Sequence, residues 1–76
     1  MIYLGQKYRI TKPVSKQHIV SVGDIITISQ ITWLGVRSMD ISVDIEGNPY
    51  NGILMFEGSY TAAEYWEKVE MCLEAV

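Results

Sequence analysis

The chain has 76 residues, enough for one domain (1–76) and too few for a second. Hydrophobic residues make up 49% of it and charged residues 20%, a composition that excludes intrinsic disorder. Its net charge of −3 argues against a protein that binds nucleic acid through a broad basic surface.

The single cysteine, Cys72, excludes an intrachain disulfide, and small secreted domains usually need such cross-links. The first residues, Met1–Leu4, lack the basic segment and the long apolar run of a signal peptide. No apolar run approaches the roughly 20 residues that cross a bilayer. We therefore expect a cytoplasmic protein that makes no membrane contact.

The first two predicted strands are residues 7–11 and 25–33, both rich in alternating apolar side chains. In the second strand the alternation slips by one position between Ser29 and Gln30. A β-bulge there would return both halves of the strand to the core and bend it.

Two further strands are predicted at 39–45 and 50–56. In the first of these, four apolar residues alternate with Asp40, Ser42 and Asp44, the pattern of an antiparallel strand with one buried face. Residues 50–56 are partly apolar on both faces. This predicts a strand covered on both sides, with a helix as one of the covers.

An amphipathic helix is predicted to begin after Thr61, because Thr61 and Glu64 have the spacing of a capping box. Apolar residues then recur every three or four positions as far as Val76, with Trp66 and Val69 at the centre of the stripe, which we expect to be buried on the sheet. The predicted fold class is mainly β (α+β): a small antiparallel, partly open barrel of four to five strands with one C-terminal amphipathic helix.

The middle of the chain carries a resemblance. Residues 18–28 read as a strand, the turn Gly23–Asp24 and a second strand, and residues 39–45 and 52–54 read as the next hairpin. This order resembles the SH3-like small-barrel superfamily over about half of the chain. The resemblance implies the barrel fold and leaves the function open, because small barrels serve many functions. Trp33 lacks the neighbouring tryptophan with which SH3 domains bind proline-rich peptides, so such ligands are not expected.

Few residues are candidates for chemistry. No nucleophile and orienting group accompany the only histidine, His18, at a recognisable spacing, so we expect it to have no catalytic role. Cys72 lies on the apolar helix stripe and is expected to be a buried, inert thiol. Asp40, Asp44 and Glu46 share an outward strand face, for which we favour a solvated surface over acid–base chemistry. The sequence thus predicts no enzyme, no catalytic residue, no metal site and no cofactor.

Non-catalytic binding of a protein partner is the function we expect. Aromatic side chains are common anchors in interfaces, and exposed acidic residues can meet a basic partner surface. The predicted contact residues are Trp33, Tyr50 and three glutamates expected on one exposed stripe of the helix, Glu67, Glu70 and Glu74. Small acidic proteins of this kind are frequent in bacteriophages and other mobile elements, where they inhibit or redirect host proteins, and we expect such a role.

A nucleic-acid-binding accessory module is the alternative. Arg37 and the basic residues of the N-terminal segment would then follow a phosphate backbone, and binding would weaken steeply as salt rises. These N-terminal residues are Lys7, Arg9, Lys12 and Lys16. Self-association is a further open possibility, because a domain of this size is only marginally stable alone.

Overall fold

The computed structural model describes residues 2–14, 20–33, 39–54 and 60–76. These residues contain, in chain order, β1 (Lys7–Ile10), β2 (Ile25–Trp33), β3 (Met39–Ile45), β4 (Asn51–Ile53), α1 (Ala62–Cys72) and β5 (Leu73–Ala75).

All five strands belong to one antiparallel sheet in the order β4-β3-β2-β1-β5. β1 to β4 each lie beside their neighbour in sequence, and β5 returns to pair with β1, with Leu73 opposite Ile10. Among the described residues no pairing joins the edge strands β4 and β5, so the sheet is not closed. The predicted class, a mainly β fold of antiparallel strands with one helix, is confirmed.

The bulge predicted in β2 is present. Ile28 lies opposite Val43, whereas Gln30 lies opposite Ser42, so β2 contains one residue more than β3 at this point. The extra residue, Ser29, shifts the alternation by one position, so that the apolar side chains of the second half of β2 point to the same face as those of the first half. The bulge therefore keeps apolar residues of both halves on the core side of the sheet.

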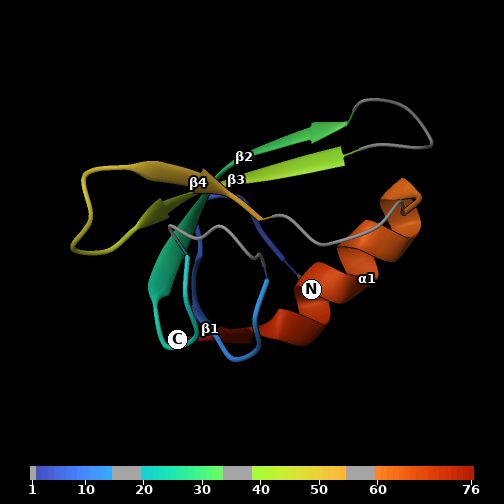
Figure 1. Ribbon diagram of the computed structural model, residues 1–76. Helices are drawn as coiled ribbons and strands as arrows, with labels where there is room; N and C mark the ends of the chain where they lie inside the picture. The colour runs from blue at the N-terminus through green and yellow to red at the C-terminus, as the bar shows by residue number, and fades with distance from the viewer. Residues whose placement is uncertain (1, 15–19, 34–38, 55–59) are drawn as a thin grey trace.

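The core lies between this face of the sheet and α1, which crosses it on one side (Figure 1). In β3 the alternation is complete: every second residue is buried, as the sequence predicts, from Met39 to Ile45. Figure 1 also shows the end of β2 and the start of β3 on the side of the molecule where α1 begins, and the β3–β4 turn at the opposite side.

The beginning of α1 matches its prediction. The Glu64 N–H donates to Thr61 Oγ1 at 3.2 Å, and the Thr61 N–H donates to Glu64 Oε1 at 3.2 Å, which completes the capping box. These bonds from the Thr61 backbone and hydroxyl lower the pKa of the Glu64 carboxyl. The capping residues thus satisfy two backbone donors that a helix start leaves open.

The end of the helix differs from its prediction. α1 stops at Cys72, Leu73 begins β5, and Val76 is exposed instead of continuing the apolar stripe. Thr11 donates to the Cys72 carbonyl from its N–H (2.8 Å) and from its hydroxyl (3.1 Å). Thr11, far away in sequence, thus satisfies the carbonyl at the helix end. The residues that follow pair with the free edge of β1 and form a strand.

The prediction for the fourth strand is wrong in its length and burial. β4 covers only Asn51–Ile53 and forms an edge of the sheet, with Asn51 and Ile53 exposed. Gly52 and Leu54 face inward, where a Cβ on Gly52 would lie 3.0 Å from a methyl group of Val20. The predicted positions after Leu54 in this strand, 55 and 56, lie outside the described residues.

Candidate functional site

Trp33 is a large aromatic residue left exposed on the core side of the sheet. It lies opposite buried Met39, and opposite residues of an antiparallel pair share a face. Yet Trp33 is 62% exposed, because it stands at the last position of β2. Its indole ring stacks on that of Trp66, with 6.4 Å between ring centroids and 17° between ring planes.

Trp66 is half-buried, so the prediction of a fully buried residue at the centre of the helix stripe is wrong for Trp66 and confirmed for Val69. Trp66 lies at the border of the stripe, where one side of the helix leaves the core. Its partner Trp33 comes from a distant part of the chain. The pair is therefore a product of the fold, and sequence reasoning proposed only Trp33 as a surface residue.

Two predicted contact residues, Glu67 and Glu70, lie beside Trp66 on the exposed side of α1. At about 100° per residue, Glu70 is displaced from Trp66 by roughly 40° around the helix and Glu67 by roughly 100° in the same direction. Lys68 lies on the side of the helix opposite to Trp66, with its Nζ 4.7 Å from the ring centroid of Tyr60. Two glutamates thus follow Trp66 on one side of the helix.

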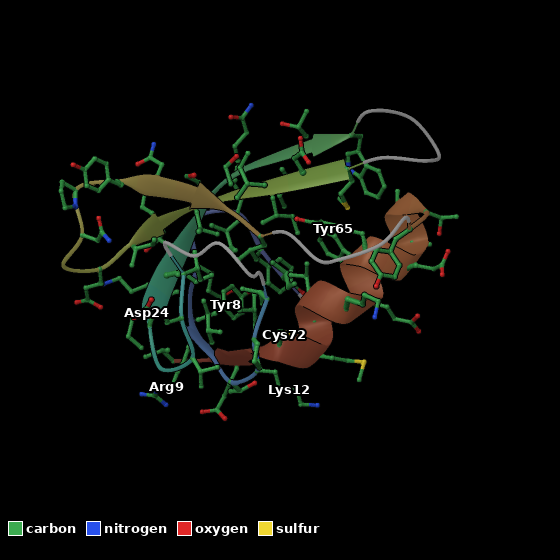
Figure 2. All side chains as sticks on the ribbon, viewed as in Figure 1. Tyr8, Arg9, Lys12, Asp24, Tyr65 and Cys72 are labelled. Atoms are coloured by element: carbon green, nitrogen blue, oxygen red, sulfur yellow. The ribbon has the colours of Figure 1, made fainter. Side chains whose placement is uncertain are left out.

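Glu74 does not join these glutamates on the helix, which corrects the prediction of one acidic helix stripe. It belongs to β5, opposite Arg9, and Arg9 Nη1 lies 3.2 Å from Glu74 Oε1 in an exposed ion pair. Figure 2 shows Arg9 and Lys12 near the end of α1, on the side of the molecule away from the end of β2. The basic N-terminal segment and part of the acidic C-terminal segment therefore meet in the folded chain.

Tyr50 is also separate from Trp33. It is 68% exposed in the β3–β4 turn, where its N–H donates to Asn48 Oδ1 at 2.9 Å. Trp33 lies opposite Met39, the first residue of β3, and the turn follows the last one. A strand advances about 3.3 Å per residue, so the length of β3 separates the two aromatic residues by roughly 20 Å.

Tyr65 fixes the helix turn that carries Trp66. Its hydroxyl donates to the Leu54 carbonyl and accepts a bond of 3.3 Å from the Ile41 N–H. Figure 2 shows the side chain between α1 and the sheet. Burial raises the pKa of Tyr65 to about 12, with a smaller contribution from the negative charge of Asp40, while the bond from Ile41 opposes the rise.

Alkaline pH should therefore destabilise the fold through Tyr65. The phenol ionises near its ordinary pKa of 10.0 in the unfolded chain and near 12 in the folded one. Its contribution to stability is complete below about pH 10 and is lost as the pH rises towards about 12. The urea midpoint should fall further between pH 9 and pH 11 in the parent than in Y65F. An equal fall in both proteins would show that other groups cause the loss of stability.

Other candidate residues form no cluster. Cys72 is buried as predicted, and burial raises the pKa of its thiol, which disfavours the reactive thiolate. Asp44 and Glu46 are exposed and Asp40 is half-buried. No three His, Cys, Asp or Glu side chains within the described ranges are placed to hold a metal ion together. His18 lies outside these ranges.

The basic residues proposed for nucleic-acid binding are only partly described. Lys7, Arg9 and Lys12 are exposed, whereas Lys16 and Arg37 lie outside the described residues. Because Arg9 is paired with an acidic residue, the described segment presents less positive charge than its sequence suggests. Within the described part of the chain, no helix combines the length and the apolar character needed to cross a membrane.

No protein-family model, curated protein or solved structure matches this chain. The resemblance to SH3-like barrels, part of which falls on residues 18 and 19 outside the described ranges, therefore stays a prediction.

Proposed function

We propose that this chain is a non-catalytic protein-binding module, and that its contact surface is the tryptophan surface formed by Trp33, Trp66, Glu67 and Glu70. The exposure of Trp33 is the observation that carries the proposal. A side chain of this size on the core side of the sheet would normally be covered, and here most of it is open to solvent. By occupying part of a partner's surface, the module would inhibit or redirect that partner.

The stacked pair has the physical properties of an interface anchor. Tryptophan is enriched among the residues whose truncation weakens protein complexes most, because a large apolar ring leaves water on binding. Contact with Trp66 already restricts the ring of Trp33 in the free protein. A ring held in advance loses less conformational entropy on binding than a free one.

The test compares two exposed aromatic residues, Trp33 and Tyr50, which lie near opposite ends of β3. The parent chain, W33A and Y50A are each immobilised and used to capture proteins from a lysate of the source organism, with mass-spectrometric identification. The affinity of the principal captured protein is then measured for all three. We expect W33A to weaken binding by about tenfold or more, the effect of an interface hot spot, and Y50A to leave it unchanged.

Both substitutions alter exposed side chains, so the thermal midpoints should stay close to that of the parent and separate binding from folding. Equal binding by W33A and the parent would contradict the proposal. Loss of binding in Y50A alone would move the contact surface to the β3–β4 turn.

A further inference from the structure

We propose that the dipeptide Asn51–Gly52 is a site of spontaneous chemical modification, and that its deamidation weakens the attachment of β4 to the sheet. The inference is independent of the proposed function, because β4 pairs with Ser42–Asp44 of β3, whereas Trp33 lies opposite Met39. It follows from the order of the two residues, the exposure of Asn51 and the side chain that lies opposite it.

The chemistry needs an asparagine whose next residue hinders the reaction least. Once hydroxide has removed the proton of the Gly52 N–H, the nitrogen attacks Asn51 Cγ, the bond from Cγ to the side-chain nitrogen breaks, and ammonia leaves. The product is a cyclic imide, a succinimide. Glycine favours this step because it has no Cβ beside the attacking nitrogen and restricts the backbone least.

Water then opens the succinimide at one of the two carbonyl bonds to the ring nitrogen. Hydrolysis of the bond from Cγ leaves aspartate in place of Asn51. Hydrolysis of the bond from the main-chain carbonyl carbon leaves isoaspartate, in which the main chain runs through Cβ and Cγ. The net reaction consumes water and releases ammonia, and each product carries a carboxylate where the side chain was neutral.

The position of β4 makes this dipeptide available. Asn51 is exposed and begins the edge strand, which pairs only with β3 among the described residues. The Leu54 N–H donates to the Ile41 carbonyl at 3.0 Å, and bonded pairs alternate along antiparallel strands, so the Gly52 N–H points towards β3. The Gly52 nitrogen is therefore released when β4 opens locally, which requires only its pairing with β3 to break.

The new carboxylate would meet an existing one. Asn51 lies opposite Asp44, and by the same alternation they form a non-hydrogen-bonded pair, in which opposite side chains lie closest. Like charges at such positions destabilise a strand pair. Isoaspartate also lengthens the main chain next to Gly52, where the packing is so close that a Cβ would lie 3.0 Å from a Val20 methyl group. Both products therefore favour the detached strand.

The first measurement follows the reaction in the folded protein. The chain is incubated at pH 8 and digested, the modified residue is located by fragmentation in a mass spectrometer, and isoaspartate is counted by enzymatic methylation. Asn48 is the internal control, because it is also exposed but precedes Pro49, which has no N–H to deprotonate. We expect conversion at Asn51 and none at Asn48 over the same period, with a rate that rises with pH and in urea.

Variants then measure the effect on the sheet. N51D carries the aspartate product, and N48D makes the same change of charge in the β3–β4 turn, where aspartate can still accept the Tyr50 N–H bond that Asn48 accepts. Freshly purified N51D should lower the equilibrium constant for folding about twofold to fivefold at low salt, as a like-charged cross-strand pair does, and less at high salt. N48D should match the parent.

Incubation should lower the urea midpoint of the parent and leave that of N51Q unchanged, because the longer glutamine side chain forms a cyclic imide much less readily. An unmodified Asn51 in the incubated folded protein, with rapid conversion in urea, would show that the sheet protects this residue and would overturn the modification site. Equal urea midpoints for N51D and N48D at low salt would overturn the effect on β4.

Discussion

Replacing Ile41 by alanine should lower the free energy of unfolding by about 2–5 kcal/mol. Ile41 is completely buried in β3, which lies between β2 and β4. Its truncation leaves a cavity under α1, at the position where β3 also contacts Tyr65. In a domain of 76 residues this is a large part of the total stability. Urea denaturation followed by tryptophan fluorescence measures the loss.

The matched control is the same substitution at Ile53. Ile53 lies on the edge strand β4 and is 45% exposed, so I53A should lower the stability by no more than about 1 kcal/mol. Equal losses in I41A and I53A would contradict the edge position of β4. They would indicate that another molecule covers this edge in solution. A molar mass of twice that of the chain would identify that molecule as a second copy.

Features that depend on neighbouring residues could be predicted from the sequence. The strand of residues 39–45 follows from strict alternation, and the slip at Ser29 is a break in that alternation. The beginning of α1 follows from Thr61 and Glu64, which bond to each other within a single helical turn. In each case the deciding interaction lies within a few residues of the signal.

Features that depend on distant residues could not be predicted. Helical spacing continues through Leu73 and Val76, so nothing local ends α1 at Cys72. The end comes from two bonds donated by Thr11 and from the free edge of β1, near the other terminus. Residues 73–75 form a strand only because that edge is present beside them.

The candidate site shows the same division. Exposure of Trp33 and of Glu67 and Glu70 was expected from residue type and helix face, and the structure brings these residues to one region. The contact with Trp66 joins distant segments, and no periodicity signals it. Glu74 was grouped with the other glutamates because helical spacing was expected to continue past Cys72, whereas it belongs to β5 and lies beside Arg9.

Replacing Tyr65 by phenylalanine should lower the free energy of unfolding by about 2–4 kcal/mol, although only one oxygen atom is removed. That oxygen donates to the Leu54 carbonyl and accepts from the Ile41 N–H, and all three residues are buried. Without the hydroxyl, one backbone acceptor and one backbone donor lose this partner away from water. Each such buried group costs about 1–3 kcal/mol when it is left unsatisfied.

Tyr50 provides the matched control, because its side chain is exposed and Y50F should leave the urea midpoint within about 0.5 kcal/mol of the parent. The cost of Y65F should also reach the tryptophan surface, since Tyr65 holds the helix turn that carries Trp66. The indole N–H signal of Trp66 should shift in Y65F and not in Y50F. A loss below about 1 kcal/mol, with this signal unmoved, would mean that water replaces the hydroxyl. The position of the tryptophan pair would then depend on the apolar packing of Ala62 and Val69 rather than on the bonds of Tyr65.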